Sequence, residues 1–329
     1  MGAPLPGLPA GAASFDNRHS MTNPAPQLEL REVSRRAGGR ELVHGLNLSL
    51  ARGHTLGLLG VNGAGKTTSL RMIAGVLAPS SGQVLIDGAD LHEEPQLAQR
   101  CIGYLPETPP LHVELSVREY LDFCARLHGV ARGAVSAAVA RAIERCDLGE
   151  VARRLLGNLS KGFRQRVGVA QAIVHEPGLI VLDEPASGLD PVQALRLREL
   201  IRSLGREHAL ILSTHVLPDV VACCDEVAIL HRGRIRHVGA VQTSESALVQ
   251  IRSIGAVDAA KWSRVPQVVE AHALDHEHWH LRLRDEAQRA DLPAALLAAG
   301  IRFSELRSAT PSLESTFLEI AGGDVAEAA

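Results

Sequence analysis

The sequence predicts an α/β fold whose parallel core sheet is covered by helices on both faces. Short apolar runs alternate with segments of helical periodicity along most of the 329 residues, a pattern typical of such sheets. A glycine-rich loop at 60–67 stands between a strand pattern and a helix pattern, and an apolar run at 179–182 ends in two acidic residues. The length fits two domains and a tail better than one domain of ~150 residues.

The first elements are short apolar strands bounded by turn residues, at 28–33, 42–50, 55–59 and 84–86. The first two, separated by Gly38 and Gly39, are expected in an antiparallel layer that feeds one buried strand. After Gly60 the apolar residues recur at i, i+3, i+4 and i+7, which predicts a helix that starts near Lys66.

The middle of the chain adds a helical segment and the rest of the sheet. Residues 114–156 have a mostly helical pattern. Two further apolar strands, 179–182 and 210–212, flank a helix that Asp190 caps and Pro191 opens. Because strands that alternate with helices pack in parallel, these elements complete the predicted core sheet.

Beyond Gly239 the pattern becomes that of a separate small α+β domain. The expected elements are strands at 248–254, 268–274, 278–283 and 301–306, helices after the first strand and at 287–299, and a closing helix after Pro311. That order resembles a split βαβ module of about ninety residues.

Composition excludes several classes of protein. The longest apolar candidate, near 292–301, is interrupted by Pro293 and Gly300 and falls short of the ~20 residues that a spanning helix needs. A net charge of −3 gives no basic surface for nucleic acid. The five cysteines are scattered without metal-ligand spacing, as in a reduced cytosolic protein.

Residues 1–26 are expected to form a disordered lead, because they are rich in Pro, Gly, Ala and Asn and show no period. No basic start precedes a long apolar stretch, so we expect no secretory leader. Met21 is an alternative start, since the ordered pattern begins only at Gln27.

Residues 60–67 match the phosphate-binding pattern G-x-x-x-x-G-K-[ST]. The glycines let the backbone wrap closely around phosphate oxygens, and the following helix offers its positive end. We expect Lys66 to reach the β- and γ-phosphates and the Thr67 hydroxyl to bind Mg²⁺. The alternative is an ordinary glycine-rich turn, which does not explain the full pattern between a strand and a helix.

The apolar strand before Asp183 and Glu184 is expected to deliver both acids beside this loop. Asp183 then holds Mg²⁺ through water, and Glu184 polarises the attacking water. Alone the motif is weak, because apolar strands that end in acids are common. Its neighbours strengthen it: LSKGFRQ stands upstream at 159–165, and SGLD at 187–190 and STH at 213–215 follow.

Over residues 28–239 this ordered set resembles the ATP-binding subunit of ABC transporters. The segments IGYLPE (102–107), LSKGFRQRVGVAQA (159–172) and LDEPASGLDP (182–191) are most similar to the ABC-2, exporter-type subfamily with its gliding-motility-like and multidrug-like ATPases. PSLESTFL at 311–318 resembles the end of the accessory domain in the same subfamily.

The resemblance implies a domain plan. Residues 27–239 would form an ABC-type P-loop NTPase domain with a parallel core sheet, an antiparallel β layer and a helical subdomain at about 107–160. Residues 240–329 would form the accessory domain.

It also implies site residues for ATP and Mg²⁺. Glu184 would be the catalytic base, His215 would contact the γ-phosphate, and Lys66 would bind phosphate. The implied metal residues are Thr67, Asp183 and Glu107. The implied ATP-binding residues are Gly60, Asn62, Gly63, Ala64, Gly65, Lys66, Thr67 and Thr68, with Ser160 and Gly162 of the signature contributed by a second copy.

The implied partners are a second nucleotide-binding domain and a membrane protein. Two such domains, in a homodimer or heterodimer, sandwich two ATP molecules and drive a separate integral membrane permease, here for export. The chain would lie in the cytoplasm, on the inner face of the cell membrane through the permease, and no nucleic acid is expected. Two alternatives stay open: a soluble ABC ATPase of the translation or DNA-maintenance type, and a non-hydrolysing regulatory subunit.

The sequence departs from the family pattern at three places. Ala37 stands where an aromatic residue usually stacks on adenine, so that stacking would be lost unless Arg36 or His44 covers the ring. Glu107 replaces the usual glutamine, and Lys161 and Phe163 alter the signature.

Two clusters and one rare residue type stand outside these motifs. Four histidines lie on the predicted C-terminal hairpin, His272, His276, His278 and His280. Two interpretations stay open for them: a transition-metal site, or the solvent-exposed face of an edge strand. Four arginines follow Asp190 on the predicted helix, Arg196, Arg198, Arg202 and Arg206. They are expected to form a solvated helix face or to contact anionic lipid. Among 34 cationic residues only three are lysines, Lys66, Lys161 and Lys261, and chemistry assigns a role only to the first.

Overall fold

The computed structural model of the protein describes residues 26–241, 248–255, 257, 259–284, 286–308 and 313–327. The predicted lead, 1–26, lies outside these residues except for Pro26. The strands are β1 (Leu28–Ala37), β2 (Arg40–Leu50), β3 (Thr55–Leu59), β4 (Ser81–Ile86), β5 (Ala89–Asp90), β6 (Ile102–Leu105), β7 (Leu179–Asp183), β8 (Ala209–Thr214), β9 (Glu226–His231), β10 (Arg234–Ala240), β11 (Leu248–Ser253), β12 (Val268–Ala273), β13 (His278–Leu283) and β14 (Phe303–Ser308). The helices are α1 (Lys66–Ile73), α2 (Pro95–Arg100), α3 (Val117–Leu127), α4 (Val135–Arg145), α5 (Lys161–Ile173), α6 (Pro191–Gly205), α7 (Leu217–Cys223), α8 (Leu292–Ala298) and α9 (Leu313–Glu327).

The core is a six-stranded sheet in the order β10-β9-β3-β8-β7-β6. Its strands run parallel from β9 to β6, and only the edge strand β10 is antiparallel. Every residue of β3, β7 and β8 is buried, as continuous apolar runs predict for strands covered on both faces. The register pairs Asp183 with Ser213 and Leu59 with Thr214, so the carboxyl ends of the three central strands meet at one edge.

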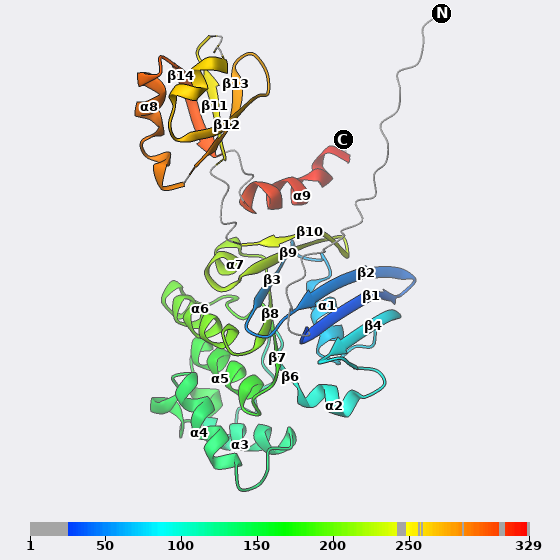
Figure 1. Ribbon diagram of the computed structural model, residues 1–329. Coiled ribbons are helices and arrows are strands. Elements are labelled where there is room, and N and C mark those ends of the chain that lie inside the picture. Colours follow the sequence, from blue (N-terminus) through cyan, green and yellow to red (C-terminus); the bar gives the residue numbers. More distant parts are fainter. Residues whose placement is uncertain are drawn as a thin grey trace, which may run out of the picture.

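An antiparallel sheet, β2-β1-β4-β5, forms the second layer. Figure 1 shows this layer on one side of the core sheet and the helices α3 to α6 on the other. Apolar side chains of β1, β2 and β4 pack with α1 and the core strands in one hydrophobic cluster. The predicted antiparallel layer and parallel core are both confirmed.

The segment predicted to be helical at 114–156 contains α3, α4 and two short 3₁₀ turns, Gly149–Val151 and Leu156–Asn158. Helix α3 starts with a capping box, in which Ser116 and Glu119 satisfy each other's backbone N–H groups. Of the apolar residues in this helix, Phe123 and Leu127 are exposed, so they lie outside the core.

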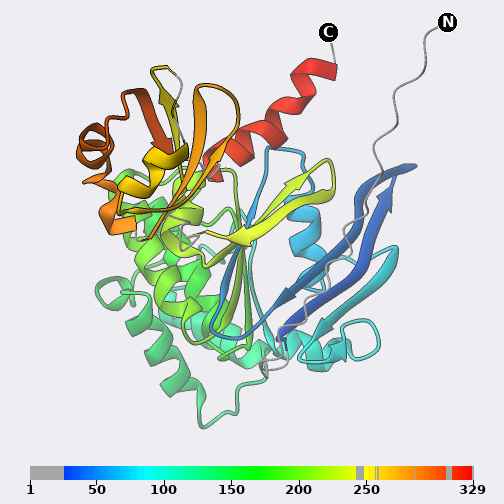
Figure 2. The same cartoon turned by 45° about the horizontal axis from the view of Figure 1, so that its top comes forward.

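The C-terminal region forms a third sheet, β12-β13-β11-β14, with every neighbouring pair antiparallel. Trp262 and Trp279 lie in its own hydrophobic cluster, with ring centroids 5.0 Å apart. Figure 2 shows this sheet and α8 above the core, with α9 beside β10. The apolar side chains Leu313, Phe317 and Ile320 of α9 pack against the hydrophobic cluster of the core sheet and helices α3 to α7, and they are not among the residues packed in this sheet's own cluster.

Two predicted helices of this region are wrong in part. The helix after the first strand is only a 3₁₀ turn, Ala259–Arg264, and the helix at 287–299 is split into a 3₁₀ turn, Glu286–Arg289, and α8. Pro293 lies in the first turn of α8 and lacks the N–H that a continuous helix would need. Gly300, at φ 71°, ends α8, and β14 therefore begins at Phe303.

Within the described part of the chain, no helix has the length and apolar character needed to cross a membrane.

Candidate nucleotide site

The loop between β3 and α1 wraps tightly because its glycines allow it. Gly63 and Gly65 have φ values of 82° and 105°, which other residues rarely adopt. A methyl group added at Gly60 would lie 2.5 Å from the Leu230 carbonyl oxygen, and one added at Gly65 would lie 3.1 Å from that of Leu42. At Gly63 it would meet nothing within 4 Å. The loop is therefore closed against the protein on one side and open on the other, a cradle that fits phosphate.

Lys66 points its ammonium back into this loop. Only 6% of the residue is exposed. Its Nζ donates to the carbonyl oxygens of Gly60, at 2.7 Å, and Val61, at 3.3 Å, and lies 3.5 Å from Glu184 Oε1. A nearly buried cation held by neutral carbonyls and one carboxylate is well placed to bind an anionic oxygen.

Asp183 joins the end of β7 to the loop and to β8. The residue is 1% exposed, and its Oδ1 accepts from the Ser213 hydroxyl at 2.6 Å and from the Thr67 hydroxyl at 3.3 Å. Hydroxyl and carboxylate oxygens at this spacing are the donors that Mg²⁺ prefers. The residues present therefore fit a magnesium ion bound between Thr67 and Asp183.

Glu184 has a strained backbone that its neighbours hold in place. Its φ is 46°, in the left-handed region, and its N–H donates to the Ser213 carbonyl at 3.2 Å and the Ser213 hydroxyl at 3.1 Å. His215 Nδ1 lies 3.0 and 2.9 Å from the two carboxylate oxygens of Glu184. The carboxylate is thus fixed between Lys66 and His215, where it can take a proton from water.

These groups line a cavity of about 480 Å³. Its lining residues are Leu42, Asn62, Gly63, Gly65, Lys66, Thr67, Thr68, Glu107, Glu184, Ser187 and His215. Most of the predicted site residues are therefore brought together, with Asp183 directly behind Thr67.

Besides Asp183, four predicted residues do not line this cavity. The Gly60 carbonyl lies behind Lys66, and Ala64 is buried, with its N–H donating to Val61 and its carbonyl accepting from Gly233. Ser160 caps α5 by accepting from the Phe163 N–H, and Gly162 packs against Gln193. The signature therefore lies apart from the phosphate loop of its own chain.

The adenine position also differs from the family pattern. Ala37 pairs with Arg40 at the exposed end of the β1–β2 hairpin. Arg36 and His44 both lie near the carboxylate of Glu41, at 3.7 and 3.2 Å, and neither lines the cavity. Leu42, 40% exposed, is the apolar side chain that does. Sequence reasoning missed Leu42 as a site residue, although it lies five residues after Ala37 on the next strand.

Comparisons with known proteins agree with a nucleotide-binding site at this position. The family model described as ABC transporter matches residues 43–187. The ABC transporter ATP-binding protein NatA of Bacillus subtilis (strain 168) is 38% identical over 204 residues, which cover 61% of this chain and 82% of that protein. The chain belongs to the ATP-binding proteins of ABC transporters.

Other relatives of this ABC ATP-binding protein cover more of it. The Nod factor export ATP-binding protein I of Rhizobium johnstonii (strain DSM 114642 / LMG 32736 / 3841) is 30% identical over 91% of this chain and 96% of its own length. The bacitracin transport ATP-binding protein BcrA of Bacillus licheniformis is 34% identical over 63% of this chain and 68% of its own. A solved ATP-binding subunit of an ABC transporter superposes with a TM-score of 0.59 and 31% identity, over 65% of this chain and 90% of that one. The predicted family is confirmed. The prediction that the chain is an ATPase of a family that couples ATP hydrolysis to transport is confirmed as well.

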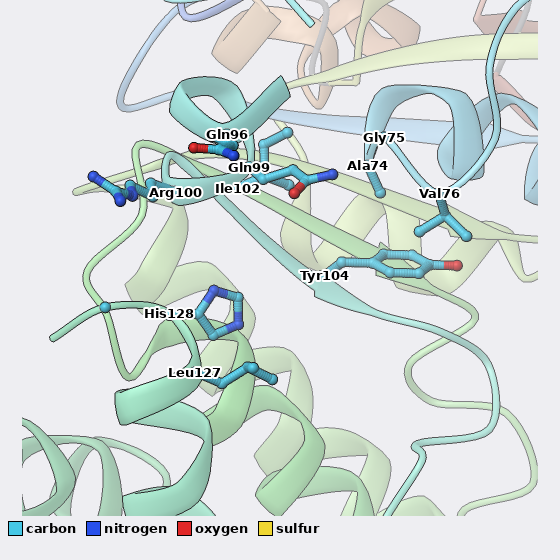
Figure 3. A pocket seen from close by; sticks show the side chains of 11 residues that line it. Ala74, Gly75, Val76, Gln96, Gln99, Arg100, Ile102, Tyr104, Leu127 and His128 are labelled. Atoms are coloured by element: carbon cyan, nitrogen blue, oxygen red, sulfur yellow. The ribbon is translucent and has the colours of Figure 1, made fainter. Parts of the chain in front are cut away.

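This ABC ATP-binding protein has a second cavity, of about 630 Å³, away from the phosphate loop. Figure 3 shows Leu127 and His128, from the end of α3, facing α2 and the end of α1 across it. The side chains that line it include Val76, Gln99, Arg100, Tyr104, Leu127 and His128. Val76 is 62% and Leu127 71% exposed, so apolar surface is presented at its rim.

The C-terminal histidines do not gather into a site. His272 lies directly opposite His280 across β12 and β13, while His278 is bound to Asp275 at 2.9 Å. Trp279 faces the other side of the sheet and is buried, as the alternation predicts. Among the described residues, no group of three or more His, Cys, Asp or Glu side chains could hold a metal ion.

Proposed function

We propose that this chain is the ATP-hydrolysing subunit of an exporter, acting in a pair of nucleotide-binding domains on a separate membrane permease. The observation that carries the proposal is the placement of Glu184 between Lys66 and His215, beside the buried Asp183. The Nod factor export protein, similar over nine tenths of this chain, supports the direction of transport.

In the proposed reaction Lys66 and the amides of the loop bind the phosphates. Glu184 accepts a proton from the attacking water, and His215 fixes the carboxylate and contacts the γ-phosphate. Mg²⁺, when bound by Thr67 and Asp183 with Glu107 nearby, would supply positive charge that stabilises the transferring phosphoryl group.

A second nucleotide-binding domain is part of the proposal because the signature lies apart from its own phosphate loop. Ser160 is exposed and stands at the start of the 13-residue helix α5, which offers its N–H groups. A copy of this chain, or a related domain, would use Ser160 and Gly162 to complete its own ATP site. Both a homodimer and a heterodimer satisfy this requirement.

The permease is proposed to dock at the 630 Å³ cavity. Its walls come from the helical segment and from the core, so a segment docked there would contact both and would be displaced when one wall moves relative to the other. The exposed apolar side chains Val76 and Leu127 at the rim suit a short apolar helix. Docking would place the chain in the cytoplasm, at the inner face of the membrane.

The domain division of the proposal is 27–239 for the nucleotide-binding domain and 240–329 for the accessory domain, with a helical subdomain at about 107–160. Separate hydrophobic clusters in the first and second regions support it. The packing of α9 on the core makes that helix a link between them.

The first test is Glu184→Gln in the full chain. We expect ATP binding to be kept, the ATP-bound dimer to persist, and hydrolysis to fall about 100-fold or more, because the proton acceptor is lost. Phosphate release and size-exclusion chromatography with ATP measure these effects. An unchanged hydrolysis rate would contradict the role of Glu184.

The wild-type chain separates the alternatives. A chain that binds ATP but never hydrolyses it would be the regulatory subunit, and one that hydrolyses ATP but never co-purifies with membranes would be a soluble ABC ATPase. The net charge of −3 gives no support for nucleic acid as the partner.

A further inference from the structure

The backbone that carries His215 is held by a hydrogen-bonded turn at the end of β8. Thr214, the last residue of that strand, is 1% exposed, and its hydroxyl accepts from the Val216 N–H at 3.0 Å. The two bonded groups lie on either side of His215, whose own side chain is 47% exposed. Since about half of the imidazole faces solvent, packing alone does not fix the ring, and its position on Glu184 depends on this turn.

Asp219 holds the same hydroxyl from the first turn of α7. Its Oδ2 accepts from the Thr214 hydroxyl at 3.2 Å, and its own N–H donates to the Val216 carbonyl at 3.0 Å. Only 8% of Asp219 is exposed. The Thr214 hydroxyl therefore uses its one proton and accepts one hydrogen bond inside the protein, which fixes its orientation.

Arg198 of α6 completes the network. Its Nε donates to Asp219 Oδ1 at 2.7 Å, and its second guanidinium nitrogen, Nη2, donates to the same oxygen. With a side chain that is 27% exposed and paired, Arg198 is not part of the solvated face predicted for the arginines of this helix. Each oxygen of the Asp219 carboxylate thus has a bonded partner, so the carboxylate cannot rotate without losing one.

We infer that three side chains outside the nucleotide cavity, those of Thr214, Asp219 and Arg198, are positioning residues for His215. By fixing the backbone around His215 they keep its imidazole on the carboxylate of Glu184. The inference rests on the proposed function, in which His215 fixes that carboxylate and contacts the γ-phosphate. None of the three lines the cavity, so they act through His215 and not on the nucleotide.

The first test is Thr214→Val in the full chain, which keeps a branched side chain and removes the hydroxyl. We expect kcat for ATP to fall about fivefold or more and KM to change less than about twofold, because the phosphate-binding loop is untouched. Thr214→Ser keeps the hydroxyl and should leave kcat within about twofold of the wild type. A smaller fall in T214V, or an equal fall in T214S, would overturn the inference.

A double-mutant cycle separates positioning from a general structural effect. If Thr214 acts through His215, T214V has nothing further to disturb once His215 is replaced by alanine. The kcat values of H215A and of the double variant T214V/H215A should then agree within about twofold. A larger difference would show that Thr214 acts by another route and would overturn the inference.

Arg198→Met tests the far end of the network and does not depend on the folding of T214V. Its matched control is Arg202→Met, at an exposed position one turn further along the same helix. We expect R198M to lower kcat about threefold or more at constant KM, and R202M to match the wild type in both. Equal kcat in the two variants would remove Arg198 from the network. Melting temperatures establish that each variant is folded at the assay temperature.

Hydrogen exchange distinguishes failure of this inference from failure of the proposed function. Unchanged hydrolysis in H215A would refute the role that the proposed function gives to His215. Exchange at the Val216 amide needs no hydrolysis, and we expect it to be about fivefold faster or more in T214V, because the amide loses its acceptor. Equal exchange in T214V and wild type would show that the hydroxyl does not hold this turn, whatever the ATPase rates are.

Discussion

Ser213 connects the two acids of the nucleotide site although it touches no substrate in the proposed reaction. Its hydroxyl donates to Asp183 Oδ1 at 2.6 Å and accepts from the N–H of Glu184 at 3.1 Å. The residue is fully buried, so water cannot replace either bond. One side chain therefore fixes both the metal-binding carboxylate and the backbone of the catalytic one.

Ser213→Ala is expected to lower the free energy of unfolding by about 1–3 kcal/mol, because it removes the shorter of the two hydrogen bonds that the buried Asp183 Oδ1 accepts and leaves only the 3.3 Å bond from Thr67. Hydrolysis should fall by about tenfold as Glu184 loses its support. Urea unfolding and steady-state ATPase assays measure the two effects. Ser203→Ala removes a hydroxyl whose hydrogen bond, among the described residues, goes to the Leu200 carbonyl in the same helix. It should change the free energy of unfolding by less than about 0.5 kcal/mol and leave the hydrolysis rate within about twofold. Equal stability of S213A and wild type would contradict this account.

The same residue shows how far sequence alone predicts the site. The loop 60–67 and the acids at 183 and 184 are local motifs, so their residues could be named in advance. Ser213 lies 30 residues from Asp183, and only the parallel register of β7 and β8 brings the two side chains together. Leu42 was missed for the same reason, since its place in the cavity depends on how the antiparallel layer packs beside the loop.

At the scale of elements, the ends of α3 and α5 meet through two stacked histidines. The rings of His128 and His175 are 3.9 Å apart and parallel within 2°. Burial, with a smaller contribution from His128, lowers the pKa of His175 to about 4, and its Nε2 lies 3.1 Å from the Ile102 carbonyl oxygen. Burial also lowers the pKa of His128. The junction between the helical segment and the core therefore favours the neutral form of both imidazoles.

This junction predicts a pH dependence of stability. Between about pH 4 and 6.5 the unfolded chain binds a proton at His175 that the folded chain does not, so stability falls as the pH falls through this window. The loss due to His175 should be on the order of 1–3 kcal/mol. His175→Asn should flatten the fall in melting temperature from pH 7 to 4.5, whereas replacing the exposed His272 by Asn should not. Parallel curves for H175N and wild type would contradict the prediction.

Element prediction succeeded where one local pattern decided the outcome and failed where two competed. The strands β3, β7 and β8 are short, mostly apolar runs, and each is buried along its whole length, as expected for strands covered on both faces. The apolar and alanine-rich stretch 287–299 favours a helix by composition, but Pro293 restricts it to α8. Phe123 and Leu127 fit a helical stripe, yet they face outward, which periodicity does not reveal when an exposed surface is itself apolar.

At the scale of the whole molecule, the nucleotide cavity and the second cavity are separate sites joined by the core sheet. Tyr104, at the wall of the second cavity, lies on β6, which pairs with β7, the strand that ends at Asp183. The helical segment forms the opposite wall. Movement of this segment relative to the sheet would therefore change the shape of the second cavity.

Leu127→Asp tests this arrangement without altering the nucleotide site. Because Leu127 is 71% exposed, the variant should fold, and its ATPase rate in the absence of membranes should stay within about twofold of the wild type. Co-sedimentation with membranes of the cells that produce the chain should fall about tenfold or more, since a charge replaces an apolar contact. Leu297→Asp, on the exposed side of α8, is the control and should sediment as the wild type does. Equal sedimentation of L127D and wild type would contradict the docking site.

The packing of α9 has a topological consequence for the accessory sheet. Because α9 packs against the core cluster, the sheet from β11 to β14 is attached at both ends to elements that contact that cluster. A chain cut after residue 241 would lose α9 along with the sheet and would expose the apolar surface that Leu313, Phe317 and Ile320 cover. Excising 248–308 and rejoining the ends would leave that surface covered. Truncation after residue 241 and excision of 248–308 therefore remove different contacts. Only the excision removes the sheet while α9 still covers the core, so only the excision measures what the sheet itself contributes to stability.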